Sequence, residues 1–171
     1  ELGEDAGEAR DQRRELLEAV RAAWPKHKPL SVRISATDWL PEGIQDDDVL
    51  VLAKALKERG TDIVDVSAGM TSPESRPRFY GRMYQAYWSD MIRNEVKIPT
   101  MSVGGISSGD QVNTLVLSGR ADLCALARPH LVNPHFTLGA AIEQGWRDTF
   151  VPPPYGLVRP LGPLPPASKP A

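Results

Sequence analysis

Apolar residues follow two different spacings along the chain, and together these predict a repeated strand–helix pattern. Four short apolar, β-branched runs predict strands at 30–35, 62–67, 98–104 and 121–127. Apolar residues at three- and four-residue spacing predict helices over 11–24, 46–60, 88–96, 107–119 and 134–144. Continuous apolar strands that alternate with helices are typical of a parallel sheet covered by helices. The predicted fold class is therefore α/β.

Capping residues fix several of the helix boundaries. Pro25 ends the first helix because proline cannot continue one. Asp46 or Asp47 is expected to cap the second helix, and Ser107 or Ser108 the helix that ends at Gly119. These signals support the strand–helix alternation independently of the apolar pattern.

The two ends of the chain differ in composition from its middle. Residues 1–10 are small and charged and are expected to be flexible, whereas 11–150 carry the strand and helix pattern of a folded domain. Eight of the 16 prolines fall within 151–171, and proline fixes φ and removes a hydrogen-bond donor. The last segment is therefore expected to be an extended, proline-rich tail rather than a helix or a central strand.

Charge and cysteine content exclude some classes of function. A net charge of −2 and a pI of about 5.9 provide no basic field for a polyanion, so nucleic-acid binding is not expected. No stretch is apolar enough for a membrane span, and no signal segment opens the chain. A single cysteine cannot form an internal disulfide, which favours a reducing, cytoplasmic location. A small-molecule substrate and a protein partner both remain compatible with this composition.

Two architectures fit the alternation: an open doubly wound sheet and a set of barrel units. The chain has 171 residues, fewer than the roughly 250 of a complete (β/α)8 barrel. In both architectures the functional residues lie at the carboxyl ends of the strands. The residues to inspect are therefore those that end or follow each predicted strand.

Gly104 and Gly105 end the third predicted strand, just before a helix capped by serine. Bare backbone amides beside a helix N-terminus can bind phosphate, but a tight turn that needs glycine is an equally good interpretation. The glycine spacing matches neither the dinucleotide fingerprint nor the P-loop. Ala127 and Arg128 end the next strand, and a cation in the adjacent unit favours a two-part phosphate site.

Arg33 lies in an otherwise apolar strand and needs a partner, because an unpaired buried charge is costly. The pattern leaves open an ion pair with Asp38 or Asp65 and a role against an anionic ligand. The loop over 69–88 is rich in arginine and aromatic residues, which fits a substrate pocket, a subunit contact or simple self-packing.

Three further residues with reactive or ligating side chains are expected to have no catalytic role. His130 and His135 lack a nearby acidic third ligand, so no metal site is expected. Cys124 reads as a small core residue in the fourth strand.

Four segments resemble the carboxyl half of the Old Yellow Enzyme family, the NADH:flavin oxidoreductases. They are SVRISATDW (31–39), DIVDVSAG (62–69), IPTMSVGGI (98–106) and GRADLCALARPHLVNPHF (119–136). They are most similar to the oxidoreductase domain of bifunctional proteins of the salicylyl-CoA hydroxylase type. The resemblance implies a partial TIM (β/α)8 barrel of about four βα units, in which these strands are the fifth to the eighth. The first four strands and their substrate-binding residues are missing.

The resemblance also implies an FMN site and a role for each matching residue. Arg33 falls where the family places an arginine against the flavin ring, and Ser67 falls near the open face of that ring. Gly104 and Gly105 match the phosphate turn after the seventh strand. Ala127 and Arg128 match a Gly-Arg pair that holds the phosphate, with alanine in place of the usual glycine.

The implied activity is hydride transfer from NADH or NADPH through FMN to an activated alkene or an acceptor derived from an aromatic CoA ester. The alternative is a catalytically incomplete half-barrel that binds flavin or phosphate weakly, or acts only in assembly with a partner. That partner would be a second copy of the chain or the missing half-barrel, because an open sheet edge invites pairing.

Overall fold

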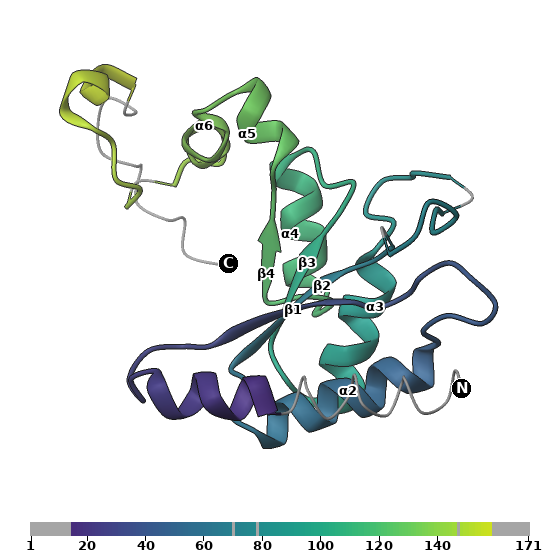
Figure 1. The fold of residues 1–171 in the computed structure, drawn as a ribbon. Coiled ribbons are helices and arrows are strands. Elements are labelled where there is room, and N and C mark those ends of the chain that lie inside the picture. The colour runs from purple at the N-terminus through teal and green to yellow at the C-terminus, as the bar shows by residue number, and fades with distance from the viewer. Residues whose placement is uncertain (1–14, 70, 78, 147, 159–171) are drawn as a thin grey trace, which may run out of the picture. The chain divides into compact units, whose positions relative to one another are not determined.

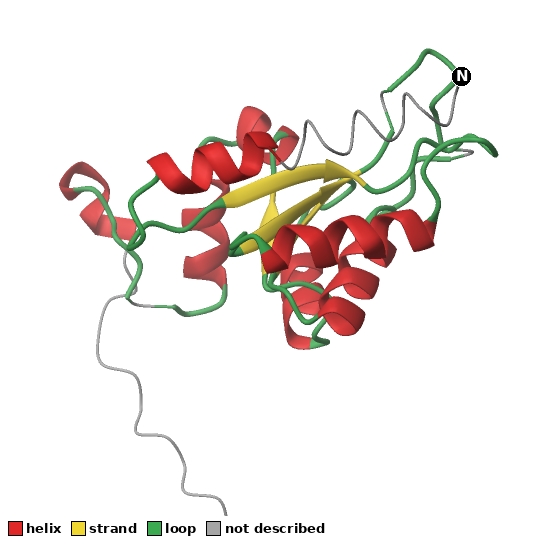
Figure 2. Cartoon of the chain, turned by 60° about the horizontal axis from the view of Figure 1, so that its bottom comes forward, coloured by secondary structure: helices red, strands yellow, loops and turns green. Residues whose placement is uncertain are grey.

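The computed structural model describes residues 15–69, 71–77, 79–146 and 148–158 (Figure 1). The chain divides into two compact units between Leu126 and Ala127, and each is described by itself. The first unit contains a parallel sheet of four strands in chain order, which Figure 2 shows in yellow. The strands are β1 (Ser31–Ser35), β2 (Ile63–Ser67), β3 (Thr100–Val103) and β4 (Leu123–Ala125). The predicted α/β class is confirmed.

Helices connect the strands, as the alternation predicted. They are α2 (Asp46–Glu58), α3 (Ala86–Met91), η1 (Ile92–Val96) and α4 (Gly109–Leu117), and a further helix over 15–23 precedes β1. η1 is π-helical and continues directly from α3. Both ends of each strand lie within two residues of the predicted position. Sequence pattern therefore located all four strands of the described sheet.

The helix caps agree with the predictions at one end and differ at another. The Ser108 hydroxyl accepts a hydrogen bond from the Gln111 amide at 3.3 Å, so Ser108 caps α4. The predicted cap of α2 is wrong by one residue, because Gln45 is the N-cap and Asp46 begins the helix. The Asp48 carboxylate accepts a hydrogen bond from the Gln45 amide at 3.3 Å, as in a capping box. Asp46, Asp47 and Asp48 all lie in the first turn, where their negative charge complements the helix dipole.

One face of the sheet is covered by helices and forms the main core. Val64 and Val66 of β2 are fully buried, as are Val49 of α2 and Ile92 of η1. These residues belong to one hydrophobic cluster, and Figure 1 shows α2 and α3 on the same side of the sheet. A second, smaller cluster surrounds Leu115 of α4. Burial of alternate strand residues therefore fixes which face of the sheet meets the helices.

The opposite face of the sheet carries a different row of side chains. The register aligns Arg33, Asp65, Met101 and Leu123 across the four strands. Leu123 is 51% exposed, although it lies in a strand. This face is thus covered less completely by the described residues than the helix face. The exposed side of the row includes the candidate residue Arg33.

The second unit is helical where it is described. It contains α5 (Arg128–Val132), α6 (Phe136–Glu143) and η2 (Pro153–Val158). The expectation of an extended tail is wrong for Pro153–Val158, which form a 3-10 helix. The fixed φ of proline, near −65°, lies within the range of this helix type, and proline is tolerated at the start of a helix. Residues 1–10 and 159–171 lie outside the described residues.

Across the described part of the chain, no helix combines the length and apolar character needed to cross a membrane.

Candidate functional site

Backbone hydrogen bonds join the carboxyl ends of β1 and β2. The Ala36 amide donates to the Ser67 carbonyl at 2.8 Å, and the Gly69 amide donates to the Thr37 carbonyl at 2.7 Å. The two segments that follow β1 and β2 therefore continue side by side beyond the strands themselves. Ser67, the last residue of β2, is paired with Ser35 and is half-buried at this end of the sheet.

An aromatic pair extends this contact toward β3. The Trp39 indole lies against Gly69, where a Cβ would stand 2.7 Å from its nitrogen. Trp39 stacks on Tyr84 with ring centroids 6.4 Å apart and meets Trp88 edge-on at 5.0 Å. Trp39 has a φ of 61°, an uncommon conformation for a residue with a side chain. Packing against Gly69 and Tyr84 offsets the backbone strain at this position.

The Gly104–Gly105 turn follows β3 and has positive φ at both residues, 100° and 67°. A Cβ on Gly105 would lie 2.5 Å from the Gly81 carbonyl oxygen and 2.9 Å from the Met83 nitrogen. The Met83 amide donates to the Gly105 carbonyl at 3.0 Å, so the loop and the turn are directly bonded. Close packing therefore requires glycine here, as one interpretation of the sequence predicted.

The same turn also has the donors that an anion needs. Among the described residues, no hydrogen bond outside the regular elements uses the amides of Gly104, Gly105 or Ile106 as donors. By contrast, the Ser107 amide donates to Gln111 Oε1 at 2.7 Å. Asp110 occupies the first turn of α4, where its charge opposes an incoming anion. Any anion at this strand end would therefore depend on the turn amides more than on the helix N-terminus.

Arg33 is paired and exposed, and the expectation that it is buried is wrong. Its Nε donates to Asp65 Oδ2 at 2.9 Å, while its side chain is 59% exposed and that of Asp65 is 14% exposed. Asp38 instead accepts a hydrogen bond from the Thr71 hydroxyl at 2.7 Å. Of the two partners considered, the structure selects Asp65. The guanidinium group is thus held by one nitrogen at the uncovered face of the sheet.

Ala127 and Arg128 belong to the second unit, so the structure does not place them relative to the Gly104–Gly105 turn. Ala127 is the N-cap of α5 with a φ of −111°, and Arg128 is its exposed first residue. The replacement of glycine by alanine therefore carries no positive-φ strain. This removes the steric objection to an anion-binding role for the pair.

The two histidines contact nearby side chains within the second unit. His130 Nε2 lies 3.2 Å from the Thr137 hydroxyl, and the His135 ring lies 5.0 Å from the Tyr155 ring. Within the described ranges, no group of three His, Cys, Asp or Glu residues is arranged to hold a metal ion. Cys124 packs beside the smaller hydrophobic cluster, and burial raises the pKa of its thiol. A thiol with a raised pKa is a weak nucleophile at neutral pH.

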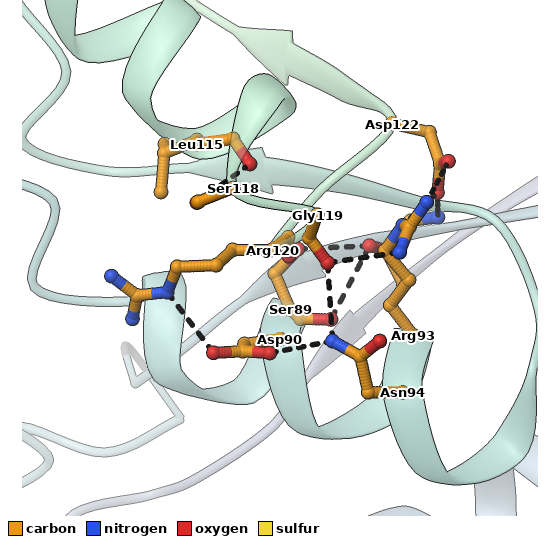
Figure 3. A network of polar contacts seen from close by, with 10 residues as sticks. Ser89, Asp90, Arg93, Asn94, Leu115, Ser118, Gly119, Arg120 and Asp122 are labelled. Carbon is orange, nitrogen blue, oxygen red and sulfur yellow. Dashed lines mark hydrogen bonds and ion pairs between the residues drawn. The ribbon is translucent and has the colours of Figure 1, made fainter.

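The amino-terminal ends of β3 and β4 carry a network of ion pairs and hydrogen bonds (Figure 3). Two nitrogens of Arg93 bind the Asp122 carboxylate at 3.0 Å each, and the Thr100 amide donates to the same group at 2.9 Å. Burial tends to raise the pKa of Asp122, but the hydrogen bonds from Arg93 and Thr100 lower it below its usual range. Arg120 pairs with Asp90 at 3.0 Å in the same network. This end of the sheet is built for stability.

Sequence reasoning missed the residues that hold the strand ends together. The aromatic content of the loop over 69–88 suggested a pocket, a subunit contact or self-packing. The hydrogen bond between the Met83 amide and the Gly105 carbonyl was not predicted. Gln85, which is 3% exposed and lies beside Gly104, was also missed. The long aromatic loop over 69–88 was a signal that this segment contributes to a site. No local sequence pattern indicates which residues of the loop contact the Gly104–Gly105 turn.

These observations define a class: part of an α/β barrel with candidate residues at the carboxyl ends of its parallel strands. The fold is similar to that of histamine dehydrogenase from Rhizobium sp. 4-9, with a TM-score of 0.64 and 25% identity over 78% of this chain and 19% of that chain. It also resembles 6-hydroxypseudooxynicotine amine oxidase from Pseudomonas geniculata N1, with a TM-score of 0.59, 24% identity and coverage of 79% and 20%. The partial barrel predicted from the sequence is therefore confirmed as the fold.

Residues 9–147 match the model of the NADH:flavin oxidoreductase / NADH oxidase family, so the chain belongs to that family. It is 44% identical over 131 residues to an NADPH dehydrogenase of Geobacillus sp. (strain WCH70), a match that covers 77% of this chain and 37% of that protein. An NADPH dehydrogenase of Clostridium acetobutylicum is 40% identical over 129 residues, with coverage of 75% and 37%. The chain thus spans less than two fifths of the length of these curated relatives.

Proposed function

We propose that this chain is the flavin-holding part of an FMN-dependent NAD(P)H oxidoreductase. The observation that carries the proposal is the Gly104–Gly105 turn, in which two positive-φ residues leave three consecutive amides uncommitted among the described residues. Such amides are suited to bind a phosphate group. The similarity to NADPH dehydrogenases supports a nicotinamide reductant, and the single cysteine supports a cytoplasmic setting.

The residues present fit FMN at its phosphate end and at its ring. Gly104 and Gly105 supply backbone amide donors in a positive-φ turn, and the side on which a Cβ would project is packed against the preceding loop. Arg33 has an exposed guanidinium group that can offset negative charge on a ring, with Asp65 fixing its position. Ser67 offers a hydroxyl at the same carboxyl end. When bound, FMN supplies the hydride chemistry, and the protein contributes orientation and charge.

Arg128 and Ala127 are proposed to complete the phosphate site from the second unit. Arg128 would form charge-assisted hydrogen bonds to phosphate, which are about twice as strong as neutral ones. The negative φ of Ala127 allows this role without backbone strain. For the acceptor, we infer an activated alkene or an aromatic-CoA-derived compound. This inference is supported by the motif resemblance to oxidoreductase domains of the salicylyl-CoA hydroxylase type.

Comparison of FMN with riboflavin tests the proposal, because the two ligands differ only by the phosphate group. The purified chain should bind FMN at least tenfold more tightly than riboflavin, as followed by quenching of flavin fluorescence. Arg128→Ala should weaken FMN binding about 10- to 100-fold, the value of a charge-assisted hydrogen bond, and leave riboflavin binding unchanged. Arg33→Ala should weaken both ligands. Equal affinity of the wild-type chain for FMN and riboflavin contradicts a phosphate site.

A specific observation also supports a role in assembly with a complementary half-barrel. The Leu30 carbonyl and the Ala36 amide both bond toward β2 or the residue before it. Backbone groups alternate sides along a strand, so those of Ser31, Arg33 and Ser35 point away from β2, where no described strand lies. The free edge of β1 is therefore available for pairing with another strand.

An apolar groove of about 550 Å³ follows this free edge and is lined by residues of the 15–23 helix, β1 and α2. Leu16 is 65% exposed and lines the groove together with Leu17 and Val20, so the groove presents contiguous apolar surface to a partner. The proposed occupant is a strand of the barrel portion that the relatives contain beyond the matched residues. The short span of the match, 37% of the Geobacillus protein, is the basis for choosing this occupant over a second copy.

Co-expression with the part of the Geobacillus NADPH dehydrogenase outside the matched 131 residues tests the assembly. The two polypeptides should co-elute as a one-to-one complex in size-exclusion chromatography with light scattering. Leu16→Asp should abolish the complex. Val51→Asp is the matched control, because Val51 is 57% exposed on α2 and does not line the groove. A homodimer that Leu16→Asp disrupts would instead identify a second copy as the occupant.

A further inference from the structure

Gln85 is a buried polar residue that the proposed FMN roles do not use. It is the N-cap of α3 and is 3% exposed. Its Nε2 donates to the Tyr84 hydroxyl at 2.9 Å, while Oε1 is buried without a hydrogen-bond partner among the described residues. Burial of an amide oxygen without a hydrogen-bond partner lowers stability. The buried, unsatisfied side chain of Gln85 therefore indicates a role other than packing.

The side chain of Gln85 lies directly against the Gly104–Gly105 turn. A Cβ on Gly104 would stand 2.7 Å from both Cδ and Oε1 of Gln85. The Tyr84 ring would approach a Cβ on Gly104 to 3.1 Å and one on Gly105 to 3.2 Å. Gln85 thus contacts the turn itself and also holds, through one hydrogen bond, the ring that packs on both glycines.

These contacts fill the side of the turn on which an ordinary residue would project its side chain. Met83, which precedes Tyr84 in the loop, donates its backbone amide to the Gly105 carbonyl. Three consecutive residues, Met83, Tyr84 and Gln85, therefore contact the two positive-φ glycines. Without them, glycine would populate several other backbone conformations at little cost.

We propose that Gln85 is a positioning residue that, with Tyr84, holds the Gly104–Gly105 turn in the conformation that binds the phosphate group of the cofactor. This inference rests on the proposed function, because it takes the turn amides as phosphate ligands. It adds that phosphate affinity is set by the loop segment before α3 as well as by the glycines. A preorganised turn binds more tightly because ligand binding does not have to order it.

The test measures the ratio of the riboflavin dissociation constant to the FMN dissociation constant. Gln85→Leu preserves most of the side-chain volume and removes the hydrogen bond to Tyr84, so the ratio should fall about tenfold while riboflavin affinity stays within twofold. Tyr84→Phe removes the other partner of that bond, retains the ring, and should lower the ratio in the same direction. It also provides a second test if Gln85→Leu does not fold.

Gln45→Leu is the matched control, because Gln45 is likewise a glutamine at a helix N-cap but precedes α2 and is bonded to the 40–43 loop. It should leave the ratio unchanged. A second readout needs no flavin: the ¹⁵N–¹H resonances of Gly104 and Gly105 should shift in Gln85→Leu and stay in place in Gln45→Leu.

The outcomes separate the two proposals. A wild-type ratio near one overturns the phosphate site, whatever the turn resonances do. A high wild-type ratio that neither Gln85→Leu nor Tyr84→Phe lowers overturns the positioning role alone. Unchanged Gly104 and Gly105 resonances in Gln85→Leu also overturn it, since the turn would then hold its conformation without Gln85.

Discussion

Replacement of Gly105 by alanine should destabilise the chain more than the same replacement at another positive-φ glycine. Gly119 is the reference, because its φ of 72° is close to the 67° of Gly105. An alanine at either position adopts the left-handed conformation at a cost of about 1–2 kcal/mol. The two sites differ in what the new methyl group meets, so their difference isolates the contact with the loop.

At Gly119 the nearest atom to the added Cβ is Arg93 Nη1 at 3.4 Å, which is an ordinary contact. At Gly105 the Cβ would lie 2.5 Å from the Gly81 oxygen and 2.9 Å from the Met83 nitrogen, and both are backbone atoms that cannot rotate away. The loop must shift, which breaks the Met83–Gly105 hydrogen bond for about 1 kcal/mol and adds overpacking of about 1–3 kcal/mol. We therefore expect Gly105→Ala to cost about 2–4 kcal/mol more than Gly119→Ala.

Urea unfolding followed by tryptophan fluorescence measures this difference. Trp88 is 8% exposed and Trp39 packs on it at 5.0 Å, so both indoles report on the same end of the first unit. Far-UV circular dichroism recorded on the same samples checks that the fluorescence change reports global unfolding. If the two alanine variants unfold within about 0.5 kcal/mol of each other, the close approach of the loop to Gly105 does not exist in solution.

Three further predictions concern the core, the ion pair and the buried thiol. Val64→Ala at a fully buried position should cost about 2–3 kcal/mol in urea unfolding, whereas Val51→Ala, at 57% exposure, should cost less than about 0.5 kcal/mol. The lowered pKa of Asp122 gives stability that is present above pH ~4 and lost as pH falls through the folded-state pKa. Arg93→Ala should therefore lower the free energy of unfolding at pH 7 and flatten this acid dependence, and an unchanged slope between pH 3 and 6 would refute the assignment. Cys124 should react with a thiol reagent at pH 7.5 at least tenfold more slowly in the native chain than in urea, because burial raises its pKa.

Local pattern was sufficient to predict the sheet, because strand burial is encoded in short apolar runs. The run over 62–67 predicted β2, and its alternate residues Val64 and Val66 are indeed fully buried. The sequence predicted Ser107 or Ser108 as a helix cap, and the structure shows Ser108 in that role, with its hydroxyl bonded within its own helix turn. Each of these features depends on residues a few positions apart, which is the range over which backbone preferences act.

Features that depend on distant contacts were predicted poorly or left open. The sequence suggested two partners for Arg33, and only the register of β1 with β2 selects Asp65, 32 residues away. The π-helical continuation η1 follows α3 without a local signal, and Lys97 ends it with a φ of 58°. The 3-10 helix over Pro153–Val158 was missed because proline content was taken to favour an extended backbone only. The fixed φ of proline is compatible with both a 3-10 helix and an extended backbone.

The two ends of β3 have different roles: ion pairs at the amino end stabilise the fold, and the turn at the carboxyl end carries the proposed binding function. At its amino end, the Thr100 amide is bonded to Asp122, and that carboxylate is held by Arg93. At its carboxyl end, the turn depends on glycine and on contacts with the loop. The strand between them is only four residues long, but its backbone is fixed by pairing on both sides. Loss of the ion pair should therefore lower stability throughout β3 without altering the local conformation of the turn. On this reasoning Arg93→Ala, tested at pH 7 where the variant remains folded, should leave the ratio of riboflavin to FMN dissociation constants unchanged, while Gln85→Leu lowers it.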